Sequence, residues 1–117
     1  MPSSPPDPAA IRSRLLTERA ALSETSQSAA ESRAPVELDQ AAVGRLSRMD
    51  AIQGQAMALA TERRRADAIR RIDQALARLD AGTYGECVIC GEPIAPRRLA
   101  LDPATATCLD CASGTRQ

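Results

Sequence analysis

The chain has 117 residues, with 15 Lys+Arg balanced by 15 Asp+Glu, so it carries no formal net charge and lacks the basic excess of a protein that coats nucleic acid. It contains no His, which excludes His-based acid–base chemistry and His metal sites. Tyr84 is the only aromatic residue, whereas alanine occupies 23 positions, and this composition favours long helices over an ordinary globular core.

Residues 1–8 are rich in Pro and Ser and are predicted to form a disordered leader. This N-terminal stretch lacks the apolar core of a signal peptide, and no run of 18 apolar residues occurs anywhere in the chain. We therefore expect a cytoplasmic protein with reduced cysteines and no membrane partner.

Two helices are predicted for residues 9–80. The first covers about 9–32, where Asp7 and Pro8 are suited to capping and opening it. After Pro35 a stronger pattern predicts a second helix over about 37–80, with residues of one stripe three or four positions apart: Leu38, Ala42, Leu46, Met49, Ile52, Ala56, Leu59, Arg63, Ala66, Ile69, Ile72, Leu76 and Leu79.

A helix of this length needs a partner along its stripe, and the first helix folding back as an antiparallel hairpin is the obvious one. The turn is expected somewhere in 33–47. A turn near Gly44 would let both helices start level at the base, whereas a turn at Pro35 would leave the second helix overhanging. The pattern does not choose between these registers, and oligomerisation through an incompletely paired second helix also remains open.

Residues 82–112 form a separate, turn-rich module, followed by a tail over 113–117. The module holds all four cysteines in the spacing C-x2-C-x17-C-x2-C: Cys87, Cys90, Cys108 and Cys111. Two closely spaced pairs of thiolates are typical of a four-cysteine zinc site. The module has little else to bury, and four thiolates leave no open coordination position, so we predict one structural Zn²⁺. Two disulfides, a redox Cys-x-x-Cys motif and an iron–sulfur cluster are the alternatives.

The segment from Ile69 to Cys87 and the residues that follow it resemble the DksA/TraR family of bacterial transcription factors. The matching residues of the finger are Cys90-Gly91-Glu92, Ile94, Arg97-Arg98-Leu99, Pro103 and Cys108-Leu-Asp-Cys111. The resemblance covers roughly residues 62–112. It implies a mostly α fold, an antiparallel two-helix coiled-coil hairpin with a small C-terminal four-cysteine zinc finger.

The resemblance also implies the function of a regulator that binds RNA polymerase and inserts its coiled coil into the secondary channel. Arg64, Arg71 and Arg98 fall where family members use cations for contact with polymerase or the alarmone ppGpp. Asp102 and Ala112 stand where those members carry further cations, so this chain lacks part of the family's pattern of residues that bind ppGpp.

The tip of the family's coiled coil carries two aspartates and an alanine. Asp39 and Ala41 match the second half of this motif, but Val36 replaces its first aspartate. We therefore expect binding to polymerase to be better preserved than promoter-selective activity.

Three other classes of function compete with this one. The main alternative is a zinc-stabilised helical adaptor that binds another protein without direct transcriptional activity. Sequence-specific DNA binding by the finger is not expected, because residues 82–117 carry more acidic groups than arginines and so would attract the phosphate backbone only weakly. Catalysis is not expected either, since no nucleophile–base pair and no open metal position are present.

Overall fold

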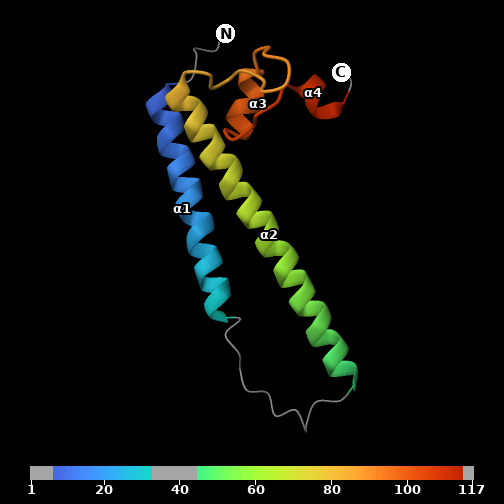
Figure 1. The fold of residues 1–117 in the computed structure, drawn as a ribbon. Coiled ribbons are helices and arrows are strands. Elements are labelled where there is room, and N and C mark those ends of the chain that lie inside the picture. Colours follow the sequence, from blue (N-terminus) through green and yellow to red (C-terminus); the bar gives the residue numbers. More distant parts are fainter. Residues whose placement is uncertain (1–6, 33–44, 115–117) are drawn as a thin grey trace.

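The computed structural model of the chain describes residues 7–32 and 45–114. Two long helices, α1 (Pro8–Ser32) and α2 (Arg45–Ala81), run antiparallel, and a small module with two short helices, α3 (Pro96–Leu101) and α4 (Leu109–Ser113), sits at one end (Figure 1). Within the described residues there are no strands, apart from an isolated bridge between Glu86 and Pro93. The predicted fold class, a mostly α hairpin with a C-terminal four-cysteine finger, is confirmed.

Helix α1 begins where its sequence provides a cap. The Asp7 carboxylate accepts a hydrogen bond from the Ala9 N–H at 3.2 Å, and the Asp7 carbonyl accepts one from the Ile11 N–H at 3.0 Å. Pro8 occupies the first helical position, where its missing N–H costs nothing. At the same end of the hairpin, α2 stops at Ala81, and Gly82 follows with φ +77°, a left-handed conformation that favours glycine.

Three polar pairs between the helices fix the register of the hairpin. Arg12 binds Asp80 at 2.5 Å, Arg19 binds Asp73 at 2.6 Å, and Arg65 lies 3.5 Å from the Ser26 hydroxyl. In each pair the two residue numbers add up to 91 or 92, and the α1 members are spaced by one heptad. The two helices therefore start level at the base, which is the first of the two registers left open above.

The segment that connects the two helices, residues 33–44, lies outside the described residues. The tip candidates Asp39 and Ala41, most of the expected turn and the first part of the predicted long helix fall within it. The expected leader falls largely in residues 1–6, and the end of the expected tail in 115–117, which also lie outside.

The hydrophobic core lies at the base of the hairpin. Leu15 of α1 is fully buried against Ile72 and Ala75 of α2, and Ala104 of the C-terminal module completes the cluster. Ile11, Leu22, Leu76 and Leu79 pack around it. One small core thus joins both helices and the module.

Away from the base, the apolar stripe of α2 leaves the interface. Met49, Ile52 and Leu59 were predicted to continue the core stripe, but they are 60%, 65% and 48% exposed. The stripe advances by 4, 3, 3 and 3 residues between Leu59 and Ile72, less on average than the roughly 3.6 residues of a helical turn. It therefore winds around α2, and the prediction of one continuous core stripe is wrong for the distal half.

The interface beyond the core is polar. Arg65 of α2 is largely buried between the helices, where it pairs with Glu62 at 2.5 Å and reaches Ser26 of α1. The Arg65–Glu62 ion pair lies within α2, so only the long contact from Arg65 to Ser26 joins the two helices here, and it holds them less firmly than packed leucines would. None of the helices in residues 7–32 and 45–114 combines the length and apolarity needed to cross a membrane.

Leu15→Ala should destabilise the hairpin by about 2–5 kcal/mol, because it removes a fully buried side chain from a core too small to collapse around the cavity. Chemical denaturation followed by circular dichroism measures this change. Leu16→Ala is the matched control on the same helix; Leu16 is 49% exposed, so its loss should stay within about 1 kcal/mol. Equal effects of the two variants would contradict the assigned core.

The pair Arg19–Asp73 predicts a pH-dependent contribution to stability. The hydrogen bond from Arg19 lowers the pKa of Asp73, against a smaller opposing effect of burial, and the positive charge of Arg19 adds to the lowering. The stabilisation is therefore present above the pKa of an unfolded aspartate, about 4, and is lost as the pH falls through the lower folded pKa.

Asp73→Asn should thus lower the midpoint of thermal unfolding at pH 7 and have a smaller effect near pH 2, because the stabilisation by the pair is lost as Asp73 becomes protonated. Arg19→Gln should reproduce this pattern, because it removes the other half of the pair. A loss that is the same at both pH values would assign the effect to packing instead.

Candidate metal centre

The first cysteine pair lies in a tight turn closed by backbone hydrogen bonds. The Gly91 N–H donates to the Cys87 carbonyl at 2.9 Å, and the Cys87 N–H donates to the Glu92 carbonyl at 2.8 Å. Gly91, directly after Cys90, has φ +77°, which a residue with a side chain adopts at a cost. The turn therefore curls so that Cys87 and Cys90 approach the same point.

The second pair is placed by the first turn of α4. Cys108 is the residue before α4 and Cys111 lies within it, and the Ala112 N–H donates to the Cys108 carbonyl at 2.9 Å. The Val88 N–H donates to the Ala106 carbonyl at 2.9 Å, which ties the two cysteine-bearing segments together. One pair on a loop and one on a helix start thus face each other.

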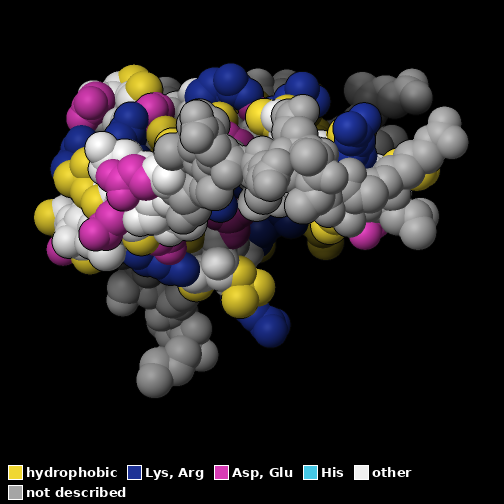
Figure 2. All heavy atoms as spheres, turned by 90° about the horizontal axis from the view of Figure 1, so that it is seen from below, with side chains coloured by type: hydrophobic (Ala, Val, Ile, Leu, Met, Phe, Trp, Pro, Cys, Tyr) yellow, Lys and Arg dark blue, Asp and Glu magenta, His cyan; other side chains and the backbone are white. Residues whose placement is uncertain are grey.

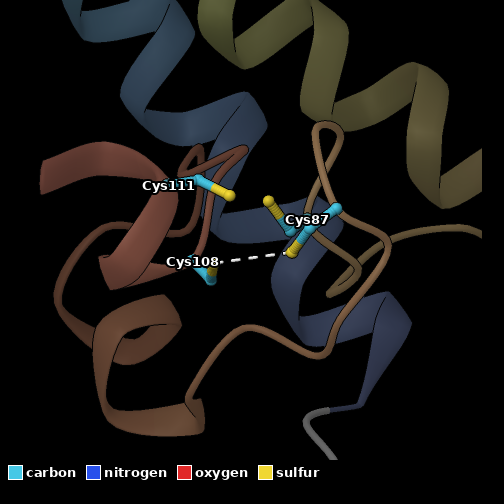
Figure 3. Close-up of side chains that lie close together, drawn as sticks. Cys87, Cys108 and Cys111 are labelled. Atoms are coloured by element: carbon cyan, nitrogen blue, oxygen red, sulfur yellow. Dashed lines mark hydrogen bonds between the residues drawn. The ribbon is translucent and has the colours of Figure 1, made fainter. Parts of the chain in front are cut away.

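The four thiols form a compact cluster. Their Sγ atoms all lie within 4.8 Å of one another, and the sulfurs of Cys90 and Cys108 are 3.7 Å apart. A tetrahedral Zn²⁺ with Zn–S bonds of about 2.3 Å would separate its sulfurs by about 3.8 Å. Figure 3 shows Cys87 on one segment and Cys108 and Cys111 on another, with their side chains pointing toward one another. The cluster has the donor set and the spacing to bind one metal ion.

The electrostatics of the cluster also suit a cation. Burial opposes ionisation of Cys87, but the backbone hydrogen bonds around it, first that of Cys90, outweigh burial and lower the pKa to about 6. For Cys111 burial and the neighbouring sulfurs act in the same direction and raise the pKa to about 12. One thiolate forms readily and another is suppressed, so a divalent cation is needed before all four can ionise.

The four cysteines are free thiols rather than two disulfides. The disulfide alternative therefore has no support in this geometry. The thiols also bury each other within a second small core that includes Ile94 and Leu99, with Tyr84 packed against it. A metal at this point would lie at the centre of the module, where it holds the loop and the two short helices together.

The finger is fastened to the hairpin by polar contacts around Ala104. Arg71 of α2 binds the Asp102 carboxylate at 2.8 Å, and Arg14 of α1 donates to the Ala100 carbonyl at 2.7 Å. The Tyr84 hydroxyl donates to the Pro103 carbonyl at 2.7 Å. The loop after α3 is thus held by both helices and by the segment that leaves α2.

Asp102 is the central acceptor of this junction. Besides Arg71, its carboxylate accepts a hydrogen bond from the Ala104 N–H at 3.1 Å. Burial opposes ionisation of Asp102, but these hydrogen bonds outweigh burial and lower its pKa. Asp102 therefore stays charged and keeps Ala104 positioned for the core.

The structure places the three candidate arginines in different surroundings. Arg64 is exposed midway along α2, where its guanidinium donates to the Thr61 hydroxyl of the same helix at 3.1 Å. Arg71 is engaged with Asp102, and Arg98 donates to the Thr107 carbonyl at 2.9 Å within the finger. Arg71 and Arg98 both lie next to Asp102, at the junction between the finger and the hairpin. Arg64 lies one heptad away from Arg71 along α2.

Sequence reasoning missed the residues of this junction. Asp102 appeared only as a departure from the family pattern, and Arg14 and Ala104 were not singled out. The signal available was weak, because an Arg–Asp pair separated by 31 residues and an alanine in a loop have no local pattern. Their roles follow from the packing of the finger on the hairpin.

The finger is the part of the chain whose sequence matches known proteins. The family model described as "Prokaryotic dksA/traR C4-type zinc finger" matches residues 82–117. An uncharacterised protein of Aquifex aeolicus (strain VF5) is 48% identical over 44 residues, which are 38% of this chain and 30% of that protein. The protein named RNA polymerase-binding transcription factor DksA of Haemophilus influenzae is 40% identical over 43 residues, 37% of this chain and 30% of its own length.

The likeness to a solved structure extends over the hairpin. The transcription factor DksA2 from Pseudomonas aeruginosa matches with a TM-score of 0.72 and 27% identity, over 92% of this chain and 81% of that one. The sequence matches to the two curated relatives span less than a third of their length. The resemblance read from the sequence is confirmed for the finger, which matches the C4 zinc finger of the DksA/TraR family, and the hairpin and finger together have a fold similar to that of DksA2.

Proposed function

We propose that the chain is a DksA/TraR-like regulator of transcription, which binds RNA polymerase and inserts its coiled coil into the secondary channel. The observation that carries this proposal is the elongated shape of the molecule, 65 × 32 × 26 Å in extent, in which a two-helix hairpin has the finger fastened at one end. A thin rod with a wider base suits a channel that admits the rod and stops the base. A curated relative carries RNA polymerase binding in its name.

In this proposal the metal has a structural role. Cys87, Cys90, Cys108 and Cys111 hold one Zn²⁺, and their four thiolates fill its coordination shell. No position remains on the ion for a substrate or an activated water, so the zinc is not catalytic, and we propose a regulator rather than an enzyme. Zinc instead fixes the finger against the hairpin.

In this proposal, polymerase contacts the exposed surface of α2 and the tip of the hairpin. Arg64 is the candidate cation with the freest surroundings, and Asp39 and Ala41 are the candidate tip residues. Arg71 already neutralises Asp102, so its charge is not freely available to an anionic alarmone. We therefore propose polymerase binding without a strong response to ppGpp, without sequence-specific DNA binding, and in the cytoplasm.

A helical adaptor remains a second candidate, and a specific observation favours it. The distal half of α2 exposes Met49, Ile52 and Leu59, which would suit the groove of another protein. An adaptor would bind such a protein without any effect on transcription.

Removal of zinc should unfold the finger and release it from the base of the hairpin. We expect one zinc per chain in protein purified under reducing conditions. A strong chelator should remove amide protection from about residues 84–113 and change the fluorescence of Tyr84, because structural zinc contributes on the order of 10 kcal/mol to folding such modules. Hydrogen exchange with mass spectrometry and tyrosine emission measure these changes.

Cys108→Ser should reproduce the effect of the chelator, whereas Val88→Ser should retain zinc, because Val88 lies between two ligands with its side chain 58% exposed. A chain that holds no metal and still protects its C-terminal amides would contradict the zinc assignment.

Binding to polymerase is tested with purified, zinc-loaded protein and core RNA polymerase. We expect a complex at micromolar concentration, and a photo-crosslinker in place of exposed Asp50 should react with peptides that line the secondary channel. The same crosslinker in place of Glu92, which is exposed on the finger, is the matched control and should not reach them.

Arg64→Glu should weaken the complex, because it reverses the charge of an exposed cation on α2 without touching the hairpin core. No complex with core enzyme would reject the proposal. A complex whose Asp50 crosslinks lie outside the channel would reject insertion and leave the adaptor.

A further inference from the structure

A short turn of the finger reaches into the core of the hairpin. We call residues 102–105 the docking turn; it is closed by a hydrogen bond from the Thr105 N–H to the Asp102 carbonyl at 3.1 Å. Ala104 and Thr105 are only 4% and 5% exposed, and Ala104 belongs to the same buried cluster as Leu15 of α1. The docking turn therefore brings part of the finger into contact with the base of the two helices.

The docking turn is tied to both cysteine-bearing segments. Two residues separate it from Cys108, and the backbone carbonyls of both are held by hydrogen bonds. The Ala106 carbonyl accepts a hydrogen bond at 2.9 Å from the N–H of Val88, which lies within the first cysteine pair. The Thr107 carbonyl accepts one at 2.9 Å from the Arg98 side chain. The path of the docking turn is therefore set by the same segments that carry the metal ligands.

Both helices of the hairpin also hold the docking turn. Arg71 of α2 binds the Asp102 carboxylate at 2.8 Å, and Arg14 of α1 donates to the carbonyl of Ala100, just before the turn, at 2.7 Å. These contacts and the burial of Ala104 all require the turn to lie at one fixed place. They are therefore present together when the finger is folded and are lost together when it is not.

Helix α1 has few other apolar contacts on which to rely. Leu15 is its one fully buried large side chain, Ile11 and Leu22 pack around the same core, and Leu16 is 49% exposed. The surface seen from the end remote from the finger shows hydrophobic side chains scattered among charged ones (Figure 2). A helix of 25 residues with so few buried side chains depends on packing for its stability. Removal of Ala104 from the core would uncover part of Leu15, at the point where α1 is best packed.

We propose that the docking turn couples the metal centre to the hairpin, so that zinc binding by the four cysteines and the pairing of α1 with α2 stabilise each other. The coupling acts in both directions, because a finger that holds α1 more firmly when zinc is bound also binds zinc more firmly when α1 is in place. Leu15 and Arg71 are thus positioning residues for a metal site that neither of them contacts. The inference extends the role of zinc beyond the finger and does not rest on binding to polymerase.

The zinc affinity of the full-length chain tests the coupling from the side of the hairpin. Competition with a chromophoric chelator under reducing conditions measures it. Leu15→Ala should raise the dissociation constant for zinc about tenfold, although Leu15 belongs to α1 and carries no charge. Leu16→Ala is the matched control, because Leu16 is the exposed neighbour on the same helix, and it should change the dissociation constant by less than about twofold.

Arg71→Gln tests the polar contact without changing the finger itself. It should raise the dissociation constant for zinc by about two- to fivefold, since Arg71 and Asp102 are both half-exposed and such ion pairs are weak. Arg71→Lys keeps a positive charge opposite Asp102 and should restore most of the affinity. Arg70→Gln is the matched control, because Arg70 is exposed beside Arg71 and pairs with Asp67 of its own helix; it should leave the zinc affinity unchanged.

Hydrogen exchange with mass spectrometry tests the coupling from the side of the metal. Protein stripped of zinc by a chelator should lose amide protection in α1 around residues 11–22 as well as in the finger, and should regain it when zinc is added back. Wild-type zinc affinity in Leu15→Ala, an equal loss of affinity in Leu16→Ala, or protection of residues 11–22 that survives removal of zinc would each overturn the inference.

Discussion

The architecture depends on the insertion of Ala104 into the base of the hairpin. This alanine belongs to the finger, yet it is buried against Leu15 of α1 and Ile72 of α2. Two helices with almost no aromatic side chains bury little apolar surface by themselves, so a third element that closes their core has a large relative effect. The metal centre acts on the hairpin through this contact, because the cysteines set the path of the loop that presents Ala104 and the Arg71–Asp102 pair holds that loop in place.

The chemistry of the finger was readable from the sequence because it is local. Cys-x-x-Cys spacing and a glycine after Cys90 specify a turn that brings sulfurs together, whatever the rest of the chain does. The cap at Asp7 was readable for the same reason. The register of the hairpin was not, since it depends on pairs such as Arg19–Asp73, and an arginine-rich chain offers many alternative pairs of equal quality. The observed pairs form together with the packing of Leu15 against Ile72 and Ala75.

The course of the apolar stripe shows a related limit. Residues three or four positions apart were taken as one surface, but successive steps of three turn that surface around the helix, so Leu59 and Ile72 lie on different sides of α2. The candidate arginines differ in the same way: their positions were assigned by resemblance, whereas the partners of Arg71 and Arg98 are set by the docked finger. Interactions across the junction therefore decide which charges remain available to a partner.

The polar contact between Arg65, Glu62 and Ser26 makes the hairpin unequal along its length. Leucine and isoleucine hold the helices at the finger, while small and charged side chains hold them farther out. Apolar packing between the helices is therefore concentrated at the end that carries the finger, so a change in the finger acts on the part of the hairpin that contributes most to its stability.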